Sequence, residues 1–248
     1  MCRYQLQISD IIYYIEANLL DSFALSLYVN KSVKMNRFVL GIIIANVLVS
    51  MKGFKEYSFL DKYKFQVGKI LSGEKIRMFS SGFLHVDWMH LIFNMYALYL
   101  FGDIVASILG TINFLVIYLG SLLAGNMYSL FYHKSEPYYS AVGASGAVSG
   151  ILYSAILLYP DMTLMMFPLP IPIPAYVFGI GYLLYSIYGM KKQLGNIGHS
   201  AHLGGAIGGF VITLLLFPRL ITEHALMVGL LAVPIVLLLL FGSKLKNV

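Results

Sequence analysis

Residues 142–159 read VGASGAVSGILYSAILLY and contain no charged side chain. A run of this length and composition predicts a helix that lies in a membrane. Ser145 and Ser149 are four residues apart, so they share one helical face, beside Gly146 and Gly150. Small residues allow the backbone of a neighbouring helix to approach closely. Ser145, at the head of this helix, is therefore either a reactive serine or part of a plain packing motif.

The composition of the whole chain is that of an integral, multi-pass membrane protein. Of its 248 residues, 59% are hydrophobic and 11% are charged, whereas soluble domains carry about 25% charged residues. The net charge of +6 favours anionic headgroups of the lipid bilayer as partners and not nucleic acid. The single cysteine, Cys2, predicts no disulfide, and no metal-binding motif is present, so we expect no metal and no other cofactor.

Apolar runs separated by polar loops predict an all-α bundle of membrane helices. The expected spans are residues 38–50, 86–105, 108–131, 142–159, 175–190, 201–217 and 225–241. The first run is short for a bilayer, so flanking residues are expected to extend it. Residues 1–36 are predicted to form an amphipathic N-terminal extension without a secretory signal. Residues 37–217 should form a six-helix core, and residues 218–248 an additional transmembrane helix and tail. Alternate prolines in residues 160–174 predict an extended connection.

A histidine stands at the head of the sixth span, in the sequence AHLGG of residues 201–205. Because one helix intervenes, the fourth and sixth spans run parallel, so Ser145 and His202 should lie at the same depth. Gly205 and Gly209 give the sixth span a small face that can pack against the fourth. A serine and a histidine are a minimal pair for nucleophilic hydrolysis. The alternative for His202 is a hydrogen-bonded core histidine.

The second span carries two further polar residues, His90 and Asn94, four residues apart in an otherwise apolar run. Hydrolysis of an acyl group develops a negative oxygen, which an imidazole and a carboxamide can stabilise by hydrogen bonds. A structural hydrogen bond between helices is the alternative. The fourth and sixth spans contain no Asp or Glu, so no third member of a catalytic triad is visible.

Together, these motifs resemble those of the rhomboid intramembrane serine proteases. The similarity covers roughly residues 77–210. HVDWMHLIFN at residues 85–94 is similar to the second-helix motif, and GASG at residues 143–146 to the nucleophile motif. AHLGG at residues 201–205, followed by Gly209, is similar to the histidine motif. The resemblance implies a serine endopeptidase that cleaves peptide bonds in or near transmembrane segments of other membrane proteins.

The resemblance also implies roles for individual residues. Ser145 would be the nucleophile and His202 the general base and acid of a dyad without aspartate. The oxyanion hole would consist of the His90 and Asn94 side chains and the backbone N–H of Ser145. Supporting positions would be Gly143, Gly146, Ser149, Gly205 and Gly209. His199, one turn before His202, competes as the base but lacks the glycine pattern of the family.

The sequence departs from the family pattern at several positions. Members often carry an aromatic residue four positions after the serine, where it stacks on the histidine. Here that position is Ser149, which puts this packing in doubt. Many members have Trp-Arg in the first loop, where this chain has Ile76-Arg77. The seventh span is an addition to the six-helix core. His85 is expected to order the loop by hydrogen bonding.

Membrane location and orientation are expectations from the resemblance. It implies a cytoplasmic N-terminus and a Ser145 site that opens to the outer face, and we expect the prokaryotic plasma membrane. This orientation places most of the 17 lysines and arginines outside, against the positive-inside trend. Alternative functions are a catalytically inactive rhomboid-like scaffold or quality-control protein, and a transporter. A transporter needs a polar path across the bilayer, whereas the polar residues here cluster at one depth.

Overall fold

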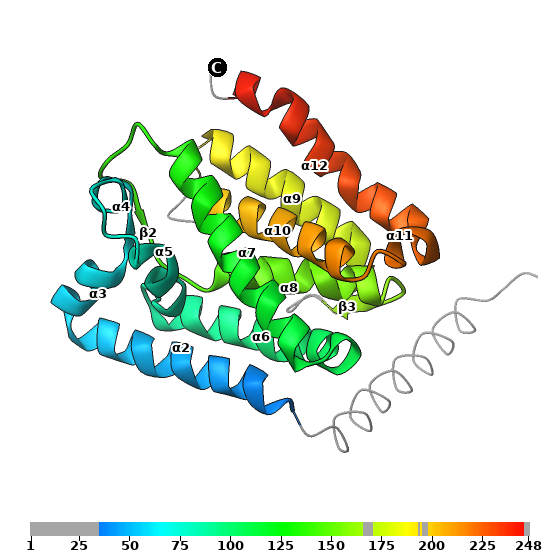
Figure 1. Ribbon diagram of the computed structural model, residues 1–248, viewed down its shortest axis with the longest axis horizontal. Coiled ribbons are helices and arrows are strands. Elements are labelled where there is room, and N and C mark those ends of the chain that lie inside the picture. The colour runs from blue at the N-terminus through cyan, green and yellow to red at the C-terminus, as the bar shows by residue number, and fades with distance from the viewer. Residues whose placement is uncertain (1–34, 166–170, 193, 195–197, 246–248) are drawn as a thin grey trace, which may run out of the picture. The chain divides into compact units, whose positions relative to one another are not determined.

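Helices make up most of the regular structure of the chain (Figure 1). The computed structural model describes residues 35–165, 171–192, 194 and 198–245. The extension predicted over residues 1–36 therefore falls almost wholly outside the described residues. The long helices of the described part are α2 (Arg37–Lys55), α6 (Trp88–Leu109), α7 (Thr111–Tyr132), α8 (Ser145–Leu158), α9 (Ala175–Lys192), α10 (His199–Leu216) and α12 (Ala225–Leu245).

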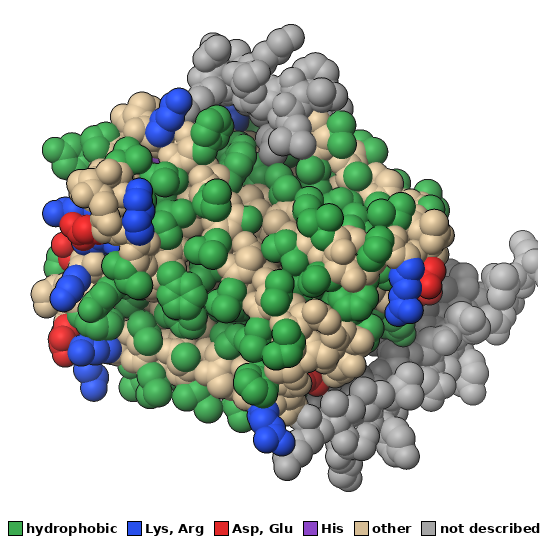
Figure 2. All heavy atoms as spheres, viewed as in Figure 1, with side chains coloured by type: hydrophobic (Ala, Val, Ile, Leu, Met, Phe, Trp, Pro, Cys, Tyr) green, Lys and Arg blue, Asp and Glu red, His purple; other side chains and the backbone are tan. Residues whose placement is uncertain are grey.

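The surface and the helix lengths are those of a membrane protein. Within the described residues, α2, α6, α7 and α10 are long and apolar enough to cross a membrane, and α8 is a shorter apolar helix. Hydrophobic side chains cover most of the face in Figure 2, and charged side chains gather at one edge, over α3 (Tyr57–Tyr63) and α4 (Val67–Leu71). The predicted fold class is confirmed: an all-α membrane bundle of six helices, followed by a seventh at the C-terminus.

The ends of the first two long helices follow from their sequences. α2 is longer than the predicted apolar run and ends with Lys52 and Lys55 in its last turn, where positive charge interacts favourably with the helix dipole. α6 begins where the Asp87 carboxylate accepts the backbone N–H of His90 at 2.7 Å. It ends at Gly110, which has a φ of 81°. The Asp87 cap fixes His90 in the first turn of α6.

α8 is the central helix and packs against α6, α7 and α10 (Figure 1). Every residue from Gly146 to Leu157 is buried. Its 14 residues span about 21 Å, which is less than the roughly 30 Å of a bilayer's hydrocarbon core. Because neighbouring helices shield it, α8 does not need to cross the whole bilayer, and its first residue, Ser145, can lie below the membrane surface.

The segment between α2 and α6 is a small folded unit. It also contains β1 (Phe65–Gln66), α5 (Arg77–Ser80) and the 3-10 helix η1 (Ser81–Phe83). Phe65, Val67 and Ile70 form its apolar core and are fully buried. β1 pairs antiparallel with β2 (Ser140–Ala141), with Phe65 opposite Ala141. This pairing ties the unit to the chain that leads directly into α8.

Arg77 anchors this unit from inside. Its side chain is only 4% exposed, and its guanidinium donates to the carbonyl oxygens of Asp61 at 2.7 Å and Lys64 at 3.0 Å. It also donates to the Glu74 carboxylate at 2.7 Å, and this bond lowers the pKa of Glu74. A buried guanidinium requires such partners, so the arginine of Ile76-Arg77 has a structural role here.

The proline-rich connection is extended at both described ends, as predicted. β3 (Thr163–Met165) pairs antiparallel with β4 (Pro172–Pro174), with Leu164 opposite Ile173. Proline cannot donate a ladder hydrogen bond, which suits a short edge strand and not a helix. After α10, the short helix α11 (Leu220–Glu223) leads to α12, which packs against α9.

Candidate active site

Ser145 is the first residue of α8, and a glycine with unusual backbone geometry precedes it. Gly143 has a φ of 136°, which favours glycine. A Cβ atom at this position would lie 2.7 Å from Cε1 of His90 and 3.6 Å from the Ser145 hydroxyl oxygen. Only glycine therefore allows the His90 ring to pack beside the turn that carries Ser145.

Hydrogen bonds from the preceding unit hold this turn. The Gly143 N–H donates to the carbonyl oxygen of Ser81 at 3.0 Å. The Ala144 N–H donates to Nε2 of His85 at 3.4 Å. His85 is fully buried and packs edge-on against His90, with ring centroids 4.9 Å apart. His85 therefore orders the backbone just before Ser145.

The bonds of His85 also define its protonation. Because Nε2 accepts the Ala144 N–H, the ring proton lies on Nδ1 and is donated to the Ser50 hydroxyl at 2.8 Å. Ser50 in turn donates to the carbonyl oxygen of Phe83 at 3.1 Å. Burial, with a smaller contribution from His90, lowers the pKa of His85 to about 3. His85 is therefore a neutral link between α2 and the Ser145 turn.

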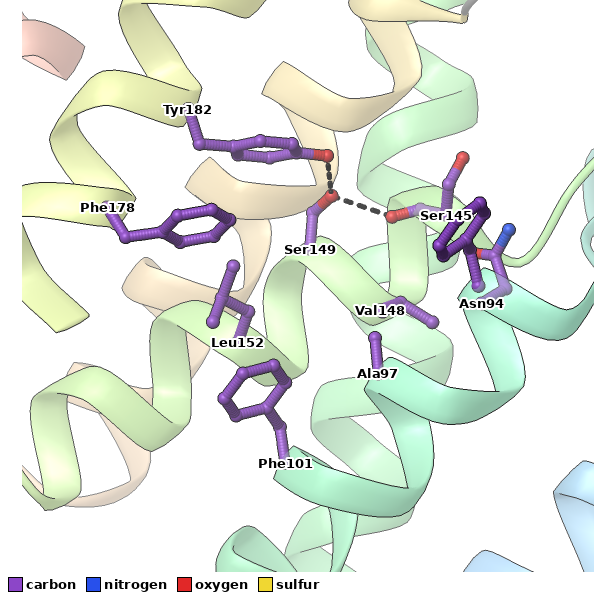
Figure 3. Close-up of a pocket in the computed structure, with 10 residues that line it drawn as sticks. Asn94, Ala97, Phe101, Ser145, Val148, Ser149, Leu152, Phe178 and Tyr182 are labelled. Carbon is purple, nitrogen blue, oxygen red and sulfur yellow. Dashed lines mark hydrogen bonds between the residues drawn. The ribbon is translucent and has the colours of Figure 1, made fainter. Parts of the chain in front are cut away.

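Asn94 follows His90 by one turn of α6 and is 6% exposed. Its side-chain amide donates one hydrogen bond to the His90 carbonyl oxygen at 2.9 Å. An amide nitrogen carries two protons, so a second N–H remains for another acceptor. Asn94 and Ser145 line the same pocket (Figure 3). An oxygen bound beside Ser145 could therefore accept the second N–H of Asn94.

This pocket has a volume of about 240 Å³ and lies between α6, α8 and α9. Asn94, Ser145, Ser149 and Tyr182 supply its polar groups. Its other lining residues are Phe93, Ala97, Phe101, Val148, Leu152 and Phe178 (Figure 3). A small polar end on a mostly apolar cavity is typical of a ligand site.

His202 lies in the first turn of α10, beside α8. A Cβ atom at Gly205 would overlap the Gly146 carbonyl oxygen, and one at Gly209 would overlap the backbone of Gly150. Both pairs advance by four residues, so the two helices run parallel, as the chain topology predicted. The backbones of α8 and α10 are in direct contact at the ends that carry Ser145 and His202.

A residue that the sequence analysis did not single out contacts both helices. Tyr182 of α9 stacks its ring on the His202 ring, with centroids 5.7 Å apart and an interplanar angle of 21°. Its hydroxyl is 2.7 Å from that of Ser149, which donates to the Ser145 carbonyl oxygen at 2.7 Å (Figure 3). The sequence pointed to Tyr182 only indirectly. Because position 149 is a serine, the aromatic residue expected there is missing, and an aromatic partner of His202 has to be sought on another helix.

Not every expected contact is present. Among the described residues, no hydrogen bond joins the Ser145 hydroxyl to the His202 ring, although catalytic bonds often tighten only when substrate binds. The competing base, His199, is 4% exposed. Its Nε2 lies 3.2 Å from the carbonyl oxygen of Leu194, and its ring is edge-on to Tyr185. His199 therefore contacts α9 and the chain that follows it, and it does not line the pocket. Its ring also lies edge-on to that of His202, with centroids 6.3 Å apart.

The chain is similar in sequence to several known proteins. The chain is 34% identical over 158 residues to "Rhomboid protein 1, mitochondrial" of Saccharomyces cerevisiae, covering 62% of this chain and 45% of that protein. It is 32% identical over 185 residues to "RHOMBOID-like protein 12, mitochondrial" of Arabidopsis thaliana, covering 68% and 55%. "Rhomboid protease GluP" of Bacillus subtilis is 37% identical over 141 residues, covering 57% and 26%. The chain spans about half the length of the first two relatives.

These relatives overturn one expectation, the prokaryotic plasma membrane. The yeast and Arabidopsis proteins are both named as mitochondrial. The expected location depended on the general family resemblance, since no residue in the chain specifies a compartment.

The relatives also give a coarse functional class, because the Bacillus protein is named as a protease. The Rhomboid domain family model matches residues 72–219. That range includes α8, α10 and all residues that line the pocket. It also includes His202, and His85 with its hydrogen-bond partners other than Ser50. The chain therefore belongs to the rhomboid family.

Proposed function

We propose that this protein is an intramembrane serine endopeptidase in which Ser145 and His202 form the catalytic dyad. The observation that carries the proposal is the pocket where the Ser145 hydroxyl, an Asn94 amide and an apolar cavity meet. His202 lies on the adjacent helix, whose backbone touches that of α8 through Gly205 and Gly146. A polar group inside a membrane bundle is costly unless it has a function.

The acylation step uses these groups in order. The Ser145 oxygen attacks the carbonyl carbon of the substrate peptide bond while its proton passes to a ring nitrogen of His202. The carbonyl oxygen becomes negative and accepts hydrogen bonds from the His90 ring, the free N–H of Asn94 and the backbone N–H of Ser145. The carbon–nitrogen bond then breaks, and His202 gives its proton to the leaving amine.

Hydrolysis of the resulting ester completes the cycle. A water molecule attacks the acyl carbon and gives one proton to His202. The bond to the Ser145 oxygen then breaks, that oxygen takes the proton back from His202, and the new carboxyl product leaves. No carboxylate is required if His202 remains neutral between steps, which an apolar environment favours.

The lining of the pocket supports a membrane-embedded segment as substrate. Phe93, Ala97, Phe101, Leu152 and Phe178 form a surface that suits an apolar side chain next to the cleaved bond. The cleaved segment must be extended locally, because a helix hides its carbonyl groups from Ser145. We therefore propose transmembrane proteins as substrates, cut where small, helix-weakening residues occur.

The proposal includes a domain arrangement and a membrane location. We propose residues 37–217 as the catalytic core, with residues 218–248 supplying the seventh helix and tail. The family match over residues 72–219 ends close to that boundary. The relatives named as mitochondrial support a mitochondrial membrane as the location.

Labelling with a fluorophosphonate probe in detergent tests the proposal, together with cleavage of a model transmembrane substrate. We expect the wild-type protein to be labelled and active, and Ser145→Ala to lose both properties. Ser107→Ala is the matched control, because Ser107 is an exposed serine on α6. A folded wild-type protein that is neither labelled nor active would overturn the proposal and favour an inactive scaffold.

A further inference from the structure

The base of the proposed dyad lacks a partner from its usual place. The resemblance predicts an aromatic residue four positions after Ser145, and this chain has Ser149 there. A serine is too small to stack on an imidazole ring. His202 would therefore rotate more freely unless another element held it.

We infer that Tyr182 of α9 is the positioning residue that holds His202 in this protein. This inference rests on the proposed protease function. The Tyr182 ring is nearly parallel to the His202 ring, at an angle of 21° and a centroid distance of 5.7 Å. Such stacked pairs of flat rings restrict each other's rotation.

A hydrogen bond from the Tyr182 hydroxyl to Ser149 holds the Tyr182 ring in place. Ser149 has one hydroxyl proton, and it is donated to the Ser145 carbonyl oxygen at 2.7 Å. Tyr182 is therefore the donor in the 2.7 Å bond between its hydroxyl and Ser149. The Tyr182 ring thus contacts the base. Its hydroxyl contacts the first turn of the nucleophile helix through Ser149 (Figure 3).

In this chain the aromatic residue that stacks on the histidine comes from α9, whereas the resemblance places it on α8 at the position of Ser149. The small Ser149 side chain leaves room beside His202 and supplies the acceptor for the Tyr182 hydroxyl. Serine at position 149 and tyrosine at position 182 therefore act as a pair. An aromatic residue at either position should hold the histidine, but the two should not be needed together.

The experiment exchanges the aromatic group between the two helices. Tyr182→Leu should lower kcat by about 10- to 100-fold, because a small misplacement of a catalytic group has effects of this size. KM should change little, since the apolar part of the pocket remains. Tyr182→Phe keeps the ring but loses the bond to Ser149, so a loss of about threefold is expected. The double variant Tyr182→Leu with Ser149→Phe places an aromatic ring on α8 instead of α9. Its kcat should recover at least half of the loss caused by Tyr182→Leu, measured as log kcat.

Tyr188→Leu is the matched control, because Tyr188 lies on the same helix, is 55% exposed and does not line the pocket. Thermal midpoints in detergent check that each variant is folded. If Tyr182→Leu cleaves at the wild-type rate, or loses activity only through KM, the positioning role of Tyr182 is wrong. The same holds if Ser149→Phe gives no recovery in a folded protein. A wild-type protein without Ser145-dependent activity would instead refute the protease proposal itself.

Discussion

The two halves of the proposed dyad are held in different ways. Around Ser145, the backbone is fixed by hydrogen bonds that Gly143 and Ala144 donate to Ser81 and His85, and by direct contact between α8 and α10. Around His202, the contacts are between rings: Tyr182 of α9 stacks on His202, and His199, one turn earlier in α10, lies edge-on to it. Ser145 is therefore held through the backbone that precedes it, whereas His202 is held through side chains.

This difference separates stability from activity. Changes on the nucleophile side should disturb packing and therefore lower both stability and turnover. Changes on the base side, such as those at Tyr182, should lower turnover alone. The predictions below test this division, beginning with the largest expected effect.

Asn94→Ala should sharpen the comparison by lowering turnover alone, because Asn94 is not one of the groups that hold the backbone before Ser145. Loss of one oxyanion donor typically lowers turnover by about 100- to 1,000-fold. The thermal midpoint should change little, because the bond from Asn94 to the His90 carbonyl lies within one helix. Asn113→Ala is the matched control, since Asn113 makes the same type of bond to Leu109 at 2.7 Å. Equal losses of turnover in both variants would contradict a special role for Asn94.

Gly205→Ala should lower both the stability of the protein and its turnover. The added methyl group would overlap the Gly146 carbonyl oxygen, and overpacking of this kind costs about 1–3 kcal/mol. α8 and α10 must then separate, which moves Ser145 away from His202. Thermal unfolding and cleavage rates measure the two effects. Gly181→Ala is the control, because no atom lies within 4 Å of a Cβ built there. A stable but inactive Gly205→Ala variant would break the proposed link between packing and activity.

The sequence predicted the features that depend on local patterns and not those that depend on distant partners. Hydropathy located the long helices, and the four-residue spacing of glycines predicted the contact between α8 and α10, because helix geometry alone defines a face. The pairing of β1 with β2 and the bonds of Arg77 depend on partners far apart in the chain. The stacking of Tyr182 on His202 likewise depends on how α9 packs. Local periodicity carries no information about such partners, so only the absence of an aromatic residue at position 149 hinted at Tyr182.

The pH dependence of stability tests the hydrogen bond between His85 and the Ala144 N–H, which holds the turn before Ser145, without altering Ser145 or His202. His85 has a pKa of about 3 when folded, against an ordinary value of 6.5. Between these values the unfolded chain binds more protons than the folded protein, so stability decreases as the pH falls. The stabilisation is complete above pH 6.5 and is lost towards pH 3, with a slope of up to about 1.4 kcal/mol per pH unit.

Thermal midpoints measured from neutral pH down to about pH 5 would show this slope. His85→Gln should flatten it, because glutamine does not titrate. The protonated ring could no longer accept the Ala144 N–H, so the turn before Ser145 would loosen as the midpoint falls. If the slope survives in His85→Gln, other groups cause it, and His85 does not link the stability of the bundle to the Ser145 turn.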